Sequence, residues 1–213
     1  MATKISTILF DLGGVLLNLN YQKTIQAFQS MGIVNFEQLY AQAAQTALFD
    51  DFETGKITAV AFQDGIRHLS GLNLSNDEIN AAWNTMLLDL PAERISFLFE
   101  LKQQYRILLF SNTNAIHLEA FRNIIERQHG NSRLLESVFD RVYYSHIEGV
   151  RKPNKQAFQH VLSEENLRAE EVLFIDDSEQ HVAGAKKLGI QAHHLVNTDV
   201  ISLVKSLGLD GVA

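Results

Sequence analysis

The chain has 213 residues, of which 46% are hydrophobic and 20% are charged, and its formal net charge is -7. This length suits one large domain or a domain with an insertion, and the apolar content is enough for a sizeable core. The negative charge, with no run of lysine or arginine, excludes the basic face that nucleic-acid binding needs. The absence of cysteine excludes disulfides and thiol chemistry. No apolar run could span a bilayer or act as a secretory signal, so we expect a soluble, cytoplasmic protein without a membrane partner.

An aspartate follows the first predicted strand. The apolar run from Ile8 to Phe10 ends at Asp11, and Gly13 and Gly14 separate it from a second apolar run, Val15 to Leu17. A short bounded run predicts a buried strand, and open α/β sheets bind ligands at the carboxyl ends of their strands. The glycines let the backbone turn and approach a bound anion closely. The alternative is a strand that ends in an Asx-type turn.

The stretch from about residue 20 to residue 88 has helical spacing and no convincing strand. Its first helix carries Tyr21, Ile25 and Phe28 on one face. Further helix starts are predicted at Asn35 with Gln38, at Thr58, and at Ser75 with Glu78. Consecutive amphipathic helices of this kind predict a small helical bundle.

From Pro91 onwards, strands alternate with helices. Strands are expected over residues 106–110, 139–144, 172–175 and 191–196. Helices are expected after Pro91, after Thr113, from near Asn154, up to Gly189 and after Thr198, with a loop over residues 145–153. This alternation predicts an α/β fold with a mainly parallel sheet. The helical stretch is then an insertion after the first strand, with hinges near residues 18–20 and 89–91.

Polar residues follow four of the predicted strands. Asp11 follows the first, Ser111 the second, Lys152 the third, and Asp176 with Asp177 the fourth. The carboxyl ends of parallel strands meet at one edge of a sheet, so these residues converge there. Separately, they also suit a helix cap, a solvated loop and a helix-dipole acid pair. Together they suit phosphoryl chemistry: carboxylates hold Mg²⁺, serine and lysine hold phosphate oxygens, and Asp11 attacks phosphorus.

The four motifs resemble those of the haloacid dehalogenase superfamily, in its magnesium-dependent phosphatase branch. They are Phe10 to Val15, Leu109 to Thr113, Arg151 to Pro153, and Phe174 to Ser178. The resemblance covers essentially the whole chain. It implies a Rossmann-like, doubly wound parallel sheet in a core of residues 1–17 and 90–213. Residues 18–89, which we call the helical insertion, resemble the small helical cap of the superfamily's subfamily IA.

Three stretches are closer still to bacterial sugar-phosphate phosphatases that act on glucose 1-phosphate. They are Gly55 to Thr58, Ser111 to Asn114 with His117, and Gly149 to Pro153. The resemblance therefore implies a small-molecule phosphate ester, and a sugar phosphate in particular, as the substrate. The oligomeric state cannot be predicted from the sequence.

The resemblance also implies a role for each site residue. Asp11 is the nucleophile that forms an aspartyl-phosphate. The Mg²⁺ ligands are Asp11, the backbone carbonyl of Gly13, and Asp177, with Asp176 binding directly or through water. The residues that hold the phosphoryl group are Ser111 and Lys152, with backbone amides around Leu12 and Asn112 as further donors.

Gly13 departs from the superfamily pattern, in which a second aspartate at this position protonates the leaving group. Such acid–base help contributes about 10²- to 10⁴-fold in rate. Possible substitutes are His117, His146, Glu148 and Asp50. The alternatives to a phosphatase are a metal-independent 2-haloacid dehalogenase, which the acid pair opposes, and a weakly active or non-catalytic phosphate-binding protein.

Substrate selection is expected in the helical insertion. Its acidic residues Asp50, Asp51 and Glu53 are candidates for binding sugar hydroxyls. The alternative is a solvated acidic turn, because acidic side chains are mostly exposed.

Overall fold

A five-stranded parallel sheet forms the centre of the core. The computed structural model describes residues 4–34, 36 and 47–209. The strands are β1 Thr7–Phe10, β2 Arg106–Ser111, β3 Arg141–Tyr144, β4 Val172–Asp176 and β5 Gln191–His194, in the spatial order β3-β2-β1-β4-β5. All strands are parallel. Strands β2 and β3 extend the sheet on one side of β1, and β4 and β5 extend it on the other, so the strand order switches direction beside β1. Ligands bind at such a switch point in open α/β sheets.

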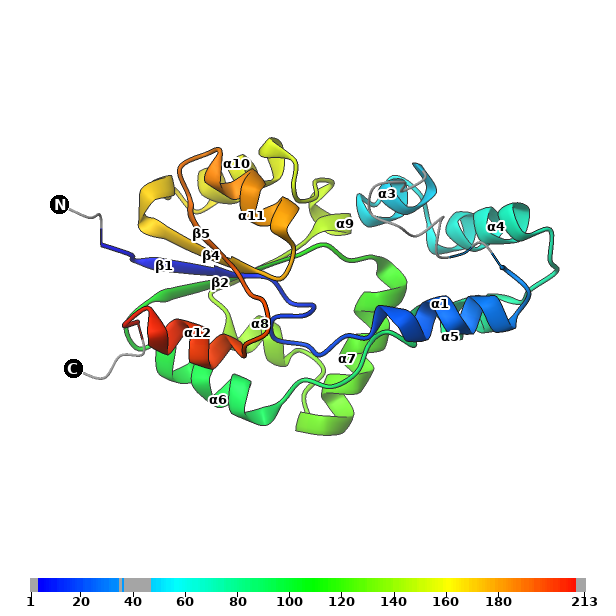
Figure 1. The fold of residues 1–213 in the computed structure, drawn as a ribbon, viewed down its shortest axis with the longest axis horizontal. Coiled ribbons are helices and arrows are strands. Elements are labelled where there is room, and N and C mark those ends of the chain that lie inside the picture. The colour runs from blue at the N-terminus through cyan, green and yellow to red at the C-terminus, as the bar shows by residue number, and fades with distance from the viewer. Residues whose placement is uncertain (1–3, 35, 37–46, 210–213) are drawn as a thin grey trace.

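Helices cover both faces of this sheet (Figure 1). One face carries α6 Ala92–Leu101, α7 Ala115–His129, α8 Leu134–Val138 and α12 Val200–Ser206. The other carries α10 Lys155–Glu164 and α11 Glu179–Lys186. Alternate strand residues serve the two faces: Ile8 and Phe10 pack in one apolar cluster, and Leu9 packs in the other. The α/β class and the doubly wound parallel sheet are confirmed.

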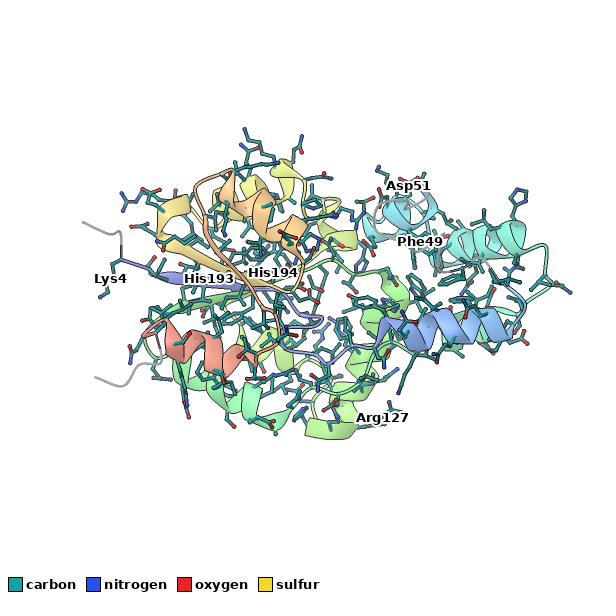
Figure 2. All side chains as sticks on the ribbon, in the orientation of Figure 1. Lys4, Phe49, Asp51, Arg127, His193 and His194 are labelled. Atoms are coloured by element: carbon teal, nitrogen blue, oxygen red, sulfur yellow. The ribbon has the colours of Figure 1, made fainter. Side chains whose placement is uncertain are left out.

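The helices of the helical insertion pack around an apolar cluster, which Ile116 of the core also joins. Its described helices are α1 Tyr21–Ser30, α3 Ala47–Glu53, α4 Ala59–Ser70 and α5 Asn76–Asn84. The ring centroid of Trp83 lies 5.5 Å from that of Phe49 and 5.2 Å from that of Phe62. Phe49 points into the insertion (Figure 2). Thr58 caps α4, and Ser75 with Glu78 forms a complete capping box on α5, as predicted. The start predicted at Asn35 and Gln38 lies outside the described residues.

The two connections to the insertion lie side by side. The amide of Asn18 donates to the carbonyl of Asp89 (2.8 Å), and the amide of Leu88 donates back to the carbonyl of Asn18 (3.0 Å). The amide of Asn20 donates to the carbonyl of Met86 (2.8 Å). The chain therefore enters and leaves the insertion through one short antiparallel pair.

Three local predictions are wrong. The segment after β3 is not all loop, because α9 Ser145–Glu148 begins directly after Tyr144 and ends at the left-handed Gly149. The third strand begins only at Arg141, since α8 runs up to Val138. The last helix is capped by Asp199, whose carboxylate accepts from the amide of Ile201 (2.8 Å), and not by Thr198. Within the described ranges, no helix has the length and apolar character needed to cross a membrane.

Candidate active site

A cleft of about 820 Å³ lies between the carboxyl edge of the sheet and the helical insertion. Four predicted site residues from four parts of the core line it: Asp11 after β1, Ser111 at the end of β2, Lys152 in the loop after α9, and Asp177 after β4. From the insertion, α1 contributes Tyr21 and Ile25, and α3 contributes Asp50 and Glu53. The convergence predicted from the strand ends is thus present in the structure.

Lys152 lies buried between two carboxylates. Its Nζ atom is 2.7 Å from Oδ1 of Asp11 and 2.7 Å from Oδ2 of Asp176. Aromatic rings of Phe110 and Phe174 lie beside the ammonium, with centroids 5.4 and 5.3 Å from it. Burial alone would lower the pKa of Lys152, but the two carboxylates outweigh it, so the pKa lies above its ordinary value. This side chain is therefore a fixed positive charge at the nucleophile.

The side chain of Asn112 positions the lysine loop. Its Oδ1 accepts from the backbone amide of Lys152 (3.0 Å), and its Nδ2 donates to the backbone carbonyl of Lys152 (2.9 Å). The side chain of Asn112 is thus engaged, and phosphate binding by backbone amides around Asn112 stays a prediction. The amides of Leu12, Gly13 and Asn112 have no acceptor among the described residues, and all three residues line the cleft. Unpaired backbone amides of this kind bind anions.

Three carboxylates form a cluster at the same edge. Asp11, Asp176 and Asp177 each place one oxygen so that the three atoms lie within 4.8 Å of one another. Burial raises the pKa of Asp11 to about 7 despite the ammonium of Lys152, and burial together with Asp176 raises that of Asp177 to about 6. Beside the single ammonium of Lys152, three neighbouring carboxylates leave the cluster short of positive charge. A small divalent cation with oxygen ligands supplies it, which is the chemistry of Mg²⁺.

Asp176 differs from its two neighbours because protein groups already satisfy it. It accepts from Lys152, from the amide of Ser178 (2.8 Å) and from Nδ1 of His181 (3.0 Å). Burial would raise the pKa of Asp176, but Lys152 and His181 hold it below its usual range. Asp11 and Asp177 are thus the carboxylates most available to a metal, and Asp176 suits binding through water. His181 was not predicted from the sequence, although it lies five residues after Asp176 on the first turn of α11.

Neither glycine after the nucleophile has room for a Cβ atom unless a neighbouring side chain shifts. Gly14 has a φ of +75°, and a Cβ atom on it would lie 2.1 Å from a carboxylate oxygen of Asp177. A Cβ atom on Gly13 would lie 2.6 Å from Cδ1 of Leu19. Leu19 thus occupies the space into which a side chain at residue 13 would point. No described contact tests the carbonyl of Gly13 as a metal ligand, so that role stays a prediction.

His117 lines the cleft, yet both of its ring nitrogens are engaged. Nε2 donates to the carbonyl of Trp83 (3.1 Å), which leaves Nδ1 to accept from the side-chain amide of Asn114 (3.2 Å). The imidazole also stacks on the indole of Trp83, with centroids 4.9 Å apart. Burial lowers the pKa of His117 to about 4, so the ring is neutral at pH 7. It joins α7 to the insertion and is poorly suited to replace the missing acid.

The other three candidates for the missing acid lie in different places. Asp50 lines the cleft, whereas Glu148 forms a hydrogen bond with Nε2 of His160 (2.8 Å) outside it. His146 faces a second, shallower pocket beside α7. Arg151 also lines the cleft and forms ion pairs with Asp50 and Glu53. The motif that contains Arg151 was recognised, but nothing in the sequence indicated where its guanidinium points.

Comparison with known families agrees with this geometry. A family model for haloacid dehalogenase-like hydrolases matches residues 5–189. The chain belongs to this family. As a haloacid dehalogenase-like hydrolase, it is an enzyme of the class predicted from the four motifs.

Two characterised members of the family align over most of the chain. The D-ribitol-5-phosphate phosphatase of Bacteroides thetaiotaomicron is 27% identical over 187 residues, which are 88% of this chain and 90% of that protein. The sesquiterpene phosphatase astK of Aspergillus oryzae is 30% identical over 204 residues, which are 93% of each chain. One of these relatives is named for a polyol phosphate and the other for a terpenoid.

A solved structure extends the comparison to the metal. The HAD family enzyme bt-2542 of B. thetaiotaomicron, crystallised as a magnesium complex, superposes with a TM-score of 0.84 at 33% identity, covering 95% of this chain and 100% of that one. An aspartate-to-alanine mutant of the same enzyme was crystallised with magnesium and inorganic phosphate. The predicted cofactor, Mg²⁺, agrees with these complexes and with the carboxylate cluster described above.

Proposed function

We propose that this hydrolase is a magnesium-dependent phosphatase that hydrolyses a small phosphorylated metabolite through an aspartyl-phosphate at Asp11. The observation that carries the proposal is the buried ammonium of Lys152 between Asp11 and Asp176, at the floor of the cleft. The ammonium orients the nucleophile and offsets the repulsion between three carboxylates and a phosphate dianion. The complexes of bt-2542 with magnesium and phosphate support the same reading.

The reaction begins at Asp11. One carboxylate oxygen of Asp11 attacks phosphorus, and the bond between phosphorus and the leaving oxygen breaks. Ser111, Lys152 and the free amides of Leu12 and Asn112 hold the oxygens of the phosphoryl group in the transition state. Water then hydrolyses the aspartyl-phosphate, which releases inorganic phosphate and restores Asp11.

The metal would be held by Asp11, the carbonyl of Gly13 and Asp177, with Asp176 through water. When bound there, Mg²⁺ supplies positive charge that favours the ionised nucleophile and the phosphate dianion. The leaving oxygen takes its proton from solvent or from a group outside residue 13, because Gly13 has no side chain. Esters with good leaving groups, such as sugar 1-phosphates, are therefore favoured.

The helical insertion moves as one body in this proposal. An apolar cluster, which Ile116 of α7 also joins, holds its helices together, and the paired connections at residues 18–20 and 86–89 form the hinge. Closure over the strand ends excludes water from the phosphoryl site and places insertion side chains against the organic part of the substrate.

One assay separates this proposal from the alternatives. Turnover of p-nitrophenyl phosphate and of 2-chloropropionate is measured with Mg²⁺ and with EDTA. We expect phosphate release that stops in EDTA and returns with Mg²⁺, and no release of chloride. Full activity in EDTA with chloride release identifies a dehalogenase, and no turnover of either compound identifies a non-catalytic phosphate-binding protein.

A further inference from the structure

An ion-pair cluster crosses the cleft from the core to the insertion. Arg151 precedes Lys152 in the core, and its guanidinium pairs with Asp50 and with Glu53 (2.9 Å) on α3. All three residues line the cleft, and only 14% of the Arg151 side chain and 17% of the Glu53 side chain are exposed. We call Arg151, Asp50 and Glu53 the boundary cluster.

The acidic residues of helix α3 lie on two different sides of the helix. Asp50 and Glu53 are three residues apart, so they share a helix face, and this face turns to the cleft. Asp51 lies on the outer side of α3 (Figure 2), pairs with Lys56 (3.2 Å) and does not line the cleft. Of the three acids that the sequence suggested for hydroxyl binding, two therefore face the substrate space. The third is a surface residue and serves as a matched control.

The cluster is fixed next to the phosphoryl site. Gly55, two residues after α3, adopts a φ of +68°, and a Cβ atom on it would lie 2.1 Å from the carbonyl oxygen of His146. The turn after α3 therefore touches α9 of the core directly. Arg151 directly precedes Lys152 in the chain, and the ammonium of Lys152 contacts the nucleophile. Asp50 and Glu53 therefore line the same cleft as the phosphoryl site, where they can contact the organic part of an ester bound at Lys152.

The charges of the cluster determine which organic group complements it. Two carboxylates share one guanidinium, so the cluster holds more acceptor capacity than Arg151 can satisfy. Burial raises the pKa of Glu53 even though Arg151 opposes the rise. An apolar chain would cover the carboxylate oxygens without giving them any donor besides Arg151, and a second phosphate would be repelled by the excess negative charge. Hydroxyl groups donate hydrogen bonds to carboxylates and are neutral.

We propose that the boundary cluster binds hydroxyl groups of the leaving alcohol and selects polyhydroxylated phosphate esters over apolar ones. This inference rests on the proposed phosphatase function and adds its substrate class. It favours a sugar or sugar-alcohol phosphate, although apolar side chains such as Ile25, Met86 and Phe121 form another part of the cleft wall.

The test compares esters that differ in hydroxyl content. We would measure kcat/KM with Mg²⁺ for ribitol 5-phosphate, glucose 1-phosphate and n-pentyl phosphate, in the wild type and in the variants Glu53→Gln, Asp50→Asn and Asp51→Asn. The selectivity is kcat/KM for the better hydroxylated ester divided by kcat/KM for n-pentyl phosphate. A hydrogen bond to a charged group corresponds to about ten- to hundred-fold in this ratio.

We expect a wild-type selectivity well above one, a loss of about ten-fold or more in Glu53→Gln, a smaller loss in Asp50→Asn, and no change in Asp51→Asn. Retained turnover of n-pentyl phosphate shows that a variant is folded with an intact phosphoryl site, and Asp50→Asn carries the test if Glu53→Gln does not fold. Equal losses for all esters would show that the cluster only holds the insertion closed, and would overturn the inference. Unchanged selectivity, or a wild-type preference for n-pentyl phosphate, would also overturn it. A wild type that hydrolyses no ester, p-nitrophenyl phosphate included, would instead refute the phosphatase function.

Discussion

His117 makes the stability of the protein fall in mild acid. Burial lowers the pKa of this ring from 6.5 to about 4 in the folded protein. Above pH 6.5 the ring is neutral in both the folded and the unfolded chain, so it contributes no pH dependence. Between pH 6.5 and pH 4, His117 binds a proton in the unfolded chain but stays neutral in the folded protein. The free energy of unfolding therefore decreases as the pH falls through this window.

The size of the loss follows from the shift in pKa. Each pKa unit corresponds to about 1.4 kcal/mol, so a shift from 6.5 to about 4 destabilises the folded protein by about 3 kcal/mol once the pH is below 4. About 2 kcal/mol of this is already lost at pH 5. A change of this size is a large part of the stability of an ordinary domain.

The assay uses the only tryptophan in the chain. Urea unfolding is followed by the fluorescence of Trp83, which stacks on His117, from pH 7.5 to pH 5 in the wild type and in His117→Gln. The variant should lose about 2 kcal/mol less than the wild type over this range, because its side chain does not titrate. Asp11 and Asp177 also titrate here, but they are the same in both proteins and cancel in the difference. Equal pH dependence, or a native-state fluorescence titration centred near pH 6.5, would refute a buried neutral His117.

Three further substitutions test the site and the insertion. Asp11→Asn keeps the shape of the nucleophile and removes its charge, so phosphatase activity should fall by about 10³-fold or more while the melting temperature stays unchanged. A variant that keeps several per cent of the activity would exclude Asp11 as the nucleophile. Lys152→Met should abolish turnover of every ester, and without Mg²⁺ it should destabilise the protein by about 3–5 kcal/mol in urea unfolding, because it removes the ammonium that pairs with the buried carboxylates of Asp11 and Asp176. Thr24→Val should cost about 1–3 kcal/mol in the same measurement, since the buried hydroxyl accepts from the amide of Met86 (3.1 Å), whereas Thr24→Ser should cost less.

The carboxyl edge of the sheet was predictable because it depends on local patterns. Short apolar runs mark β1, β2 and β4, and the polar residue after each run must lie at the same edge once the strands are parallel. Asp11, Ser111 and Asp176 follow from this rule alone. Helix α9 was missed, because four residues are too few to show a helical period.

The direction of individual side chains was not predictable. The side-chain amide of Asn112 turns to the backbone of Lys152, and His117, one candidate for the missing acid, uses both ring nitrogens on neighbours; the sequence indicated neither contact. Arg151 reaches Asp50 across the cleft only because the insertion packs over the strand ends. Contacts between segments about a hundred residues apart leave no local pattern in the sequence.

Leu19 and Gly13 constrain each other during evolution. Gly13 does not adopt a positive φ, so the backbone itself would accept an aspartate there, but Leu19 lies in the way. An aspartate at residue 13 requires the half-buried Leu19 side chain to shift or to be replaced by a smaller one, so we expect the two positions to covary. Relatives with an aspartate at the position of Gly13 should therefore carry smaller side chains at the position of Leu19. Large apolar residues there should accompany glycine, and this covariation can be checked in aligned family sequences.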